Sequence, residues 1–193
     1  MTHFVVLIIV PAHIYILGDD AVKFYITAIM TKYDENYEVA FHIYKTVEVV
    51  KKDYEEFDKT YNSIKEFYGD NVKIDTDGNL LSTHNPNSLY DYWMVGGRWS
   101  CLFLDIEGRE GDESVENNSI SVKQLLANLE QNPQRYTFNI IIDRTGKLHS
   151  SRNMGWWGSY EKTVGDDEWV ATYKRVLENT EDGDHVVNLD CHI

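Results

Sequence analysis

Residues 2–10 read Thr-His-Phe-Val-Val-Leu-Ile-Ile-Val, and Pro11 follows them. Many of these side chains are β-branched, and such side chains favour strands. A short apolar run that stops at a proline predicts a buried strand at the centre of a sheet. The run has no basic residues before it and is too short to cross a bilayer, so it does not resemble a signal peptide or a membrane span.

The rest of the chain mixes helical and strand patterns. Amphipathic spacing and capping residues predict helices at 19–31, 50–67, 121–131 and from 166 onward. Strands are predicted at 37–44, where apolar and polar residues alternate, and at 100–106, 136–143, 147–151 and 186–192, with the third and fourth of these flanking Thr145-Gly146 as a hairpin. Because these elements do not repeat as strict βαβα units, the predicted fold class is α+β, with an antiparallel or mixed sheet and helices packed on one side. A single domain is expected over 1–193, with a polar excursion at about 107–134.

Composition narrows the classes of function. The formal net charge is −14, which argues against non-specific binding to nucleic acid and leaves either simple solubility or mimicry of nucleic acid. The cysteines, Cys101 and Cys191, have no CxxC spacing. This argues against a disulfide framework or a structural zinc site and fits a reducing cytoplasm. No metal or cofactor is predicted.

Tryptophan and glycine cluster in two short runs, Tyr90–Trp99 and Met154–Gly158. Aromatic faces, bare backbone and one arginine suit a flat or anionic ligand. The candidate ligand-binding residues are Trp93, Gly96, Gly97, Arg98, Trp99, Trp156 and Trp157. The alternative is a tight turn whose tryptophans pack in the core and whose arginine pairs with Asp91. If the second run is extended, only one of Trp156 and Trp157 can enter the core, because adjacent side chains in a strand point to opposite faces.

A second candidate site involves the two ends of the chain. Strand alternation places Asp190 and His192 on one face, and Cys191 with Val187 and Leu189 on the other. His3 would lie on the same face of the first strand as Val5 and Leu7. If the first and last strands are neighbours, the candidate catalytic residues His3, Asp190 and His192 meet, as acid and base or as metal ligands. The alternative is a hydrogen-bonded structural pair of histidines.

At these motifs the chain resembles a family of uncharacterised proteins from tailed phages and prophages. The resemblance rests on Met1–Ile8, Tyr33–Asn36, Ser82–Trp93, Gly96–Trp99, Met154–Gly158 and Asp190–Ile193. It implies a virus-encoded accessory protein that acts in the host bacterial cytoplasm. Cys101 departs from the family, which usually has glycine there, and the segment at 107–134 is shorter than usual.

Three functions remain open. The favoured hypothesis is a binding module that captures a small nucleotide-type ligand, such as a host immune signal, and so counters host defence. The second is an enzyme that cleaves such a ligand with His3, Asp190 and His192. The third is an acidic protein that blocks a host defence protein directly. No membrane partner is expected, and a homo-oligomer is compatible with the sequence.

Overall fold

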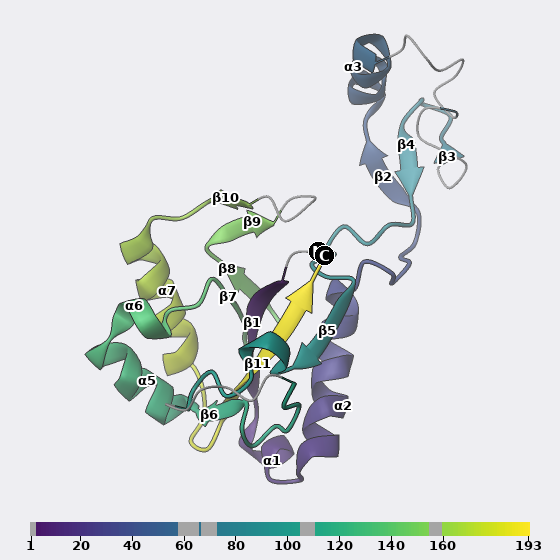
Figure 1. The fold of residues 1–193 in the computed structure, drawn as a ribbon. Helices are drawn as coiled ribbons and strands as arrows, with labels where there is room; N and C mark the ends of the chain where they lie inside the picture. Colours follow the sequence, from purple (N-terminus) through teal and green to yellow (C-terminus); the bar gives the residue numbers. More distant parts are fainter. Residues whose placement is uncertain (1–2, 58–65, 67–72, 105–110, 155–159) are drawn as a thin grey trace. The chain divides into compact units, whose positions relative to one another are not determined.

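The computed structural model describes residues 3–57, 66, 73–104, 111–154 and 160–193 (Figure 1). The chain divides into two compact units, one of Met1–Asp34 with Leu89–Ile193 and one of Glu35–Ser88. The single domain predicted over 1–193 stays a prediction. Within the first unit, the Leu89 amide donates to the Tyr33 carbonyl over 2.7 Å, and Asp34 forms a β-bridge with Tyr90. The chain therefore leaves and re-enters the first unit at adjacent points.

The first unit is built on a mixed sheet. Its strands are β1 (His3–Val10), β5 (Tyr92–Val95), β6 (Ser119–Ser121), β7 (Ile140–Ile142), β8 (Leu148–Ser150) and β11 (His185–His192). They run in the order β5-β11-β1-β7-β8, and β6 also pairs with β11. Strand β1 is antiparallel to β11 and parallel to β7, so the predicted central strand is confirmed. The predicted hairpin is confirmed as β7 and β8.

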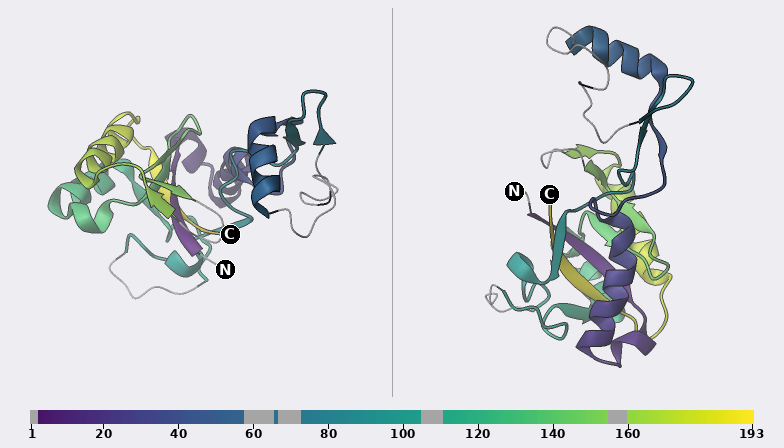
Figure 2. Two further views of the ribbon diagram at one scale, coloured as in Figure 1. Left: turned by 90° about the horizontal axis from the view of Figure 1, so that it is seen from above. Right: turned by 90° about the vertical axis from the view of Figure 1, so that its right-hand side faces the viewer.

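Helices cover both faces of this sheet (Figures 1 and 2). One face carries α2 (Asp19–Met30), which follows the short α1 (Ala12–Tyr15) and leads into η1 (Thr31–Tyr33). The other face carries α5 (Val122–Gln131) and α7 (Asp166–Glu178), with the short α6 (Pro133–Tyr136) after α5. The predicted α+β class with a mixed sheet is confirmed, whereas the expected placement of the helices on one side differs from this arrangement. The physical reason is that the central strand is apolar on both faces, and each face must be covered.

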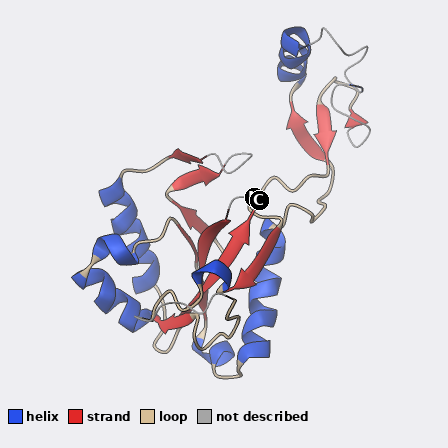
Figure 3. Cartoon of the chain, in the orientation of Figure 1, coloured by secondary structure: helices blue, strands red, loops and turns tan. Residues whose placement is uncertain are grey.

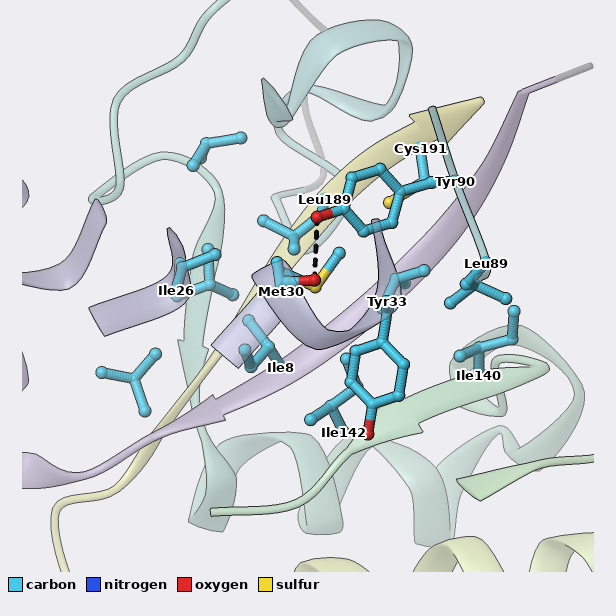
Figure 4. Packing of buried hydrophobic residues seen from close by; sticks show 14 of the residues in the cluster. Ile8, Ile26, Met30, Tyr33, Leu89, Tyr90, Ile140, Ile142, Leu189 and Cys191 are labelled. Carbon is cyan, nitrogen blue, oxygen red and sulfur yellow. Dashed lines mark hydrogen bonds between the residues drawn. The ribbon is translucent and has the colours of Figure 1, made fainter. Parts of the chain in front are cut away.

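Alternate side chains of β1 enter two separate hydrophobic clusters, one on each face of the sheet. Val6 and Ile8 pack with Ile26 and Met30 of α2, and Figure 4 shows the Tyr90 hydroxyl donating to the Met30 carbonyl over 2.8 Å. Leu7 and Ile9 belong to the opposite cluster, which contains the buried face of α7. That face comprises the four residues predicted for it, Trp169, Tyr173, Val176 and Leu177.

The strand predicted at 100–106 is wrong over its described residues. Gly97–Trp99 instead form a 3-10 turn, η2, and the Leu102 and Leu104 amides donate to the carbonyls of Trp99 and Cys101. Cys101 has a φ of 61°, a left-handed conformation that glycine adopts most easily. Glycine would therefore suit this position better than cysteine does. The segment therefore forms hydrogen-bonded turns although its apolar side chains are typical of a strand.

The second unit contains a three-stranded antiparallel sheet and one described helix (Figure 3). The strands are β2 (His42–Lys45), β3 (Lys73–Ile74) and β4 (Leu80–Ser82), in the order β2-β4-β3. Helix α3 (Val47–Phe57) matches the start of the helix predicted at 50–67, most of the remainder of which lies outside the described residues. The strand predicted at 37–44 begins only at His42. None of the helices in the described ranges is both long and apolar enough to cross a membrane.

The turn between β7 and β8 depends on one carboxylate. Asp143 Oδ1 accepts from the Thr145 amide at 2.9 Å and the Lys147 amide at 3.1 Å, while Oδ2 lies 2.9 Å from His149 Nε2. Burial alone would raise the pKa of Asp143, but hydrogen bonds from Thr145, His149 and Lys147 lower it to about 2. The ionised carboxylate therefore stabilises the hairpin.

We expect Asp143→Asn to lower the free energy of unfolding at pH 7 by about 2 kcal/mol. The pKa of Asp143 is lower in the folded chain than the ordinary value of about 3.9, so its contribution is complete above about pH 4 and is lost as the pH falls toward 2. Urea titrations at pH 7 and pH 2.5 should show the difference between the two proteins shrinking. An equal difference at both pH values would contradict the assignment.

Candidate functional site

The first and last strands bring two histidines together at one end of the sheet. In the antiparallel register of β1 and β11, His3 lies directly opposite His192. Their ring centroids are 5.3 Å apart and the ring planes are inclined by 46°. The conditional prediction that these strands are neighbours and that their polar residues meet is confirmed.

His3 is paired with the buried carboxylate of Asp190. Its Nδ1 lies 2.9 Å from Asp190 Oδ1, and Asp190 is only 3% exposed. The other oxygen, Oδ2, accepts from the Arg98 backbone amide at 3.0 Å. Two donors therefore compensate a carboxylate that has lost its water, as a buried charge requires.

His192 is paired with a second carboxylate, Asp91, which immediately precedes β5. Its Nδ1 lies 2.5 Å from Asp91 Oδ1, in an ion pair when the imidazole is protonated. The ring of Tyr92 lies 5.1 Å from the His192 ring at an angle of 32°, and Tyr92 is 51% exposed. Tyr92 therefore offers an aromatic surface beside the paired histidine.

In both pairs a carboxylate oxygen lies close to Nδ1 of the imidazole, as a hydrogen bond for His3 and as a short contact without hydrogen-bond geometry for His192. An imidazole approached in this way can present its Nε2 atom to a substrate. The His3 and His192 side chains retain 18% and 15% of their exposure, respectively. Two partly exposed imidazoles thus lie side by side, and imidazole is the side chain most often used as an acid or a base.

Cys191 lies outside this site, as strand alternation predicted. Its side chain is fully buried in the cluster that packs against α2. Burial, and secondly the charge of Asp190, raise the pKa of the Cys191 thiol well above its ordinary value. A thiol that stays protonated is a poor nucleophile, so Cys191 is a core residue.

The loop that carries Arg98 is attached to β11 by unusually close backbone contacts. A Cβ on Gly97 would lie 2.6 Å from Asp190 Cβ, and a Cβ on Gly96 would lie 2.4 Å from the Asp112 carbonyl oxygen. Both glycines also have positive φ, 69° for Gly96 and 55° for Gly97. The two glycines are therefore needed for the Arg98 amide to reach Asp190.

Two buried asparagines form hydrogen bonds to this loop. Asn188 lies two residues before Asp190 on the same face of β11, and its side-chain Nδ2 donates to the Trp99 carbonyl at 3.0 Å. The backbone carbonyl of Asn188 accepts from the Gly96 amide at 3.1 Å. Asn118 Oδ1 accepts from the Cys101 amide at 2.9 Å. Because amides such as these are costly to bury without partners, the network fixes the position of the loop.

The structure joins part of the predicted tryptophan and arginine site to the histidine site. Gly97 and Arg98 contact Asp190 directly, and the Trp99 side chain is 36% exposed. Trp93 instead lies opposite Cys191 and packs against the core on the α2 side, away from the face that carries Asp190. Trp156 and Trp157 lie outside the described residues.

The alternative pairing of Arg98 with Asp91 is not observed. Asp91 approaches His192, and the exposed Arg98 side chain forms no ion pair with another residue of the described ranges. Sequence reasoning missed the roles of Asp91 and Tyr92 at the histidine site. Their proximity to the Gly-Gly-Arg-Trp motif was the available signal, but only the pairing of β5 with β11 connects them to His192.

Within the described residues, no three His, Cys, Asp or Glu side chains converge as ligands of one metal ion. Comparisons with protein-family models, with curated proteins and with solved structures found no match. The fold and site therefore define this chain as an α+β protein whose terminal strands carry two histidine–aspartate pairs beside a glycine-framed arginine loop.

We expect Gly97→Ala to lower the free energy of unfolding by about 3 kcal/mol, because the methyl group overlaps Asp190 and the residue must keep a positive φ. The matched control is Gly111→Ala, which has a φ of 85° but no atom within 4 Å of the added Cβ. This control should cost about 1 kcal/mol, from backbone strain alone. Equal losses in urea titrations of the two variants would show that the contact with Asp190 is unimportant.

Proposed function

We propose that the protein is an acid–base enzyme that acts on a small, phosphate-bearing nucleotide at the His3 and His192 site. The observation that carries the proposal is the pair of adjacent imidazoles, each with a carboxylate at Nδ1. One such pair is common in structural roles, but two pairs with rings 5.3 Å apart provide both a proton acceptor and a proton donor for one substrate.

Arg98 favours a phosphate as the reacting group. Its guanidinium is exposed, whereas its backbone is held against Asp190, so the side chain is free to bind an anion close to His3. Guanidinium groups bind phosphate oxygens through two parallel hydrogen bonds. The partly exposed rings of Tyr92 and Trp99 would provide stacking surfaces for a base.

The overall charge favours a small substrate. At a formal net charge of −14, the protein repels a long polyanion, whereas a mononucleotide or dinucleotide presents few phosphates to that field. In the setting implied by the resemblance, a phage protein in the bacterial cytoplasm, the substrate would be a nucleotide signal of host defence. Destroying such a signal and sequestering it have the same biological result.

The histidine pairs favour turnover over simple sequestration. A binding module needs aromatic and cationic groups but no paired proton donor and acceptor. Direct inhibition of a host protein by an acidic surface makes no use of this site either. The two alternatives are therefore distinguished from the enzyme by the fate of a bound nucleotide.

We expect His3→Ala and His192→Ala each to lower the rate of nucleotide cleavage by about 10²–10⁴-fold while nucleotide still binds, because proton transfer is lost and Arg98 remains. Chromatography of a panel of mononucleotides, dinucleotides and cyclic nucleotides measures turnover, and thermal shift measures binding. The control is His185→Ala at the opposite end of β11, where the ring stacks on Tyr15. Intact nucleotide recovered after binding to the wild-type protein would identify a sequestering protein instead.

We expect Arg98→Ala to weaken nucleotide binding by about 10–100-fold, the usual loss for one charged hydrogen-bonding group. Stability should change little, because alanine keeps the backbone amide that donates to Asp190. Arg98→Lys should restore part of the affinity, since it keeps the charge but not the forked geometry. Titration of nucleotide into each variant measures the affinity. If Arg98→Ala failed to fold, the result would show that the Arg98 side chain has a structural role instead.

A further inference from the structure

The candidate site contains proton-transfer groups but no evident nucleophile. Among the described residues, Cys191 faces the opposite side of the sheet, and Ser100 Oγ is occupied by hydrogen bonds to the Gly97 and Asp112 carbonyls at 2.7 and 2.9 Å. Asp190 is held by His3 and the Arg98 amide, and Asp91 lies against His192. Within the described part of the chain these groups are thus already engaged, which favours water or the substrate itself as the source of the atom that attacks phosphorus.

We propose that the substrate is a ribonucleotide phosphodiester whose own 2′-hydroxyl is the nucleophile. This inference rests on the proposed function and names the substrate class of the same site. A hydroxyl on the sugar that carries the phosphate is already beside the phosphorus atom, and intramolecular attack of this kind has an effective molarity of about 10⁵–10⁸ M. A site that supplies only a base, an acid and a cation is sufficient for such a substrate.

The proposed step balances without any further reactant. One histidine takes the proton of the 2′-hydroxyl through Nε2, and the 2′ oxygen forms a bond to phosphorus. The bond from phosphorus to the 5′ oxygen breaks, and the second histidine, protonated at Nε2, gives its proton to that oxygen. The products are a 2′,3′-cyclic phosphate and a free 5′-hydroxyl.

The surroundings of the two rings fit this division of work. The attacking and leaving oxygens lie on opposite sides of phosphorus, so the acid and the base must be separate groups that flank one phosphate. His3 comes from β1 and His192 from β11, and each is held by its own carboxylate at Nδ1. Arg98 has an exposed side chain and a backbone amide bound to Asp190, and its guanidinium would compensate the charge that develops on the phosphate oxygens.

Among the described side chains, Tyr92 also places a hydroxyl beside the site, since its ring lies 5.1 Å from the His192 ring. Its exposed ring would stack against a base. Tyr92→Phe keeps the ring and removes the hydroxyl, so it separates a nucleophile on the protein from one on the substrate. Tyr92→Ala should weaken substrate binding by about 10-fold or more, because it removes the ring.

The test compares matched dinucleotides and cyclic dinucleotides that differ only in the 2′-hydroxyl. The wild-type protein should cleave the ribonucleotide to a 2′,3′-cyclic phosphate and a 5′-hydroxyl, identified by mass spectrometry. The 2′-deoxy analogue should bind with similar affinity, inhibit competitively and be cleaved at least 10³-fold more slowly, because it lacks the intramolecular nucleophile. His3→Ala and His192→Ala should abolish cleavage of the ribonucleotide.

The outcomes separate this inference from the proposed function. Histidine-dependent cleavage of both analogues at similar rates, or a product with a 5′-phosphate, would overturn the inference and leave the acid–base enzyme in place. Loss of cleavage in Tyr92→Phe with binding retained would move the nucleophile to the protein and also overturn it. Binding without cleavage of any member of either series would overturn the inference and the proposed function together.

Discussion

The antiparallel pairing of the first strand with the last is the constraint on which the rest of this structure depends. It sets β1 in the middle of the sheet and places His3 opposite His192. A slip of one residue would exchange the two faces of β11, sending Cys191 toward α7 and Asp190 into the apolar cluster against α2. Both clusters of the core oppose that slip, so hydrophobic burial fixes the register and the register in turn forms the histidine pairs.

Polar groups on β11 connect the sheet to the arginine loop. Asn188 and Asp190 lie on one face of a strand whose other face buries Val187, Leu189 and Cys191, and both bind the loop through its backbone. Burying these groups is costly unless each finds a partner, and an apolar pair would pack the sheet at least as well. What the polar residues add is a defined position for the Arg98 backbone on the carboxylate that also binds His3, which is the position that the proposed function requires.

The local sequence pattern predicted an element correctly where residues within that element determine its conformation. Ser121 accepts from the Gln124 amide at the start of α5, and alternation along β11 separated Asp190 from Cys191 correctly. Pattern was insufficient where the structure depends on distant contacts. Residues 100–104 form an apolar run like that of a strand, but the hydrogen bond from the Cys101 amide to Asn118 holds them in a turn. The insertion of Glu35–Ser88 and the approach of Asp91 to His192 likewise depend on pairings that no local signal encodes.

In the proposed enzyme, the charges of the site would also discriminate between phosphate groups. An acid–base pair works with one histidine protonated and one neutral, so Arg98 and that imidazolium together would balance the two carboxylates, Asp91 and Asp190. A phosphodiester would add a single negative charge to this balanced set, whereas a phosphomonoester would add up to two beside the same carboxylates. The surrounding protein, at a net charge of −14, increases that repulsion. In the proposed enzyme, the carboxylates beside the histidines would therefore also select against monoesters, and a site of this composition would suit an internal phosphodiester bond better than a terminal phosphate.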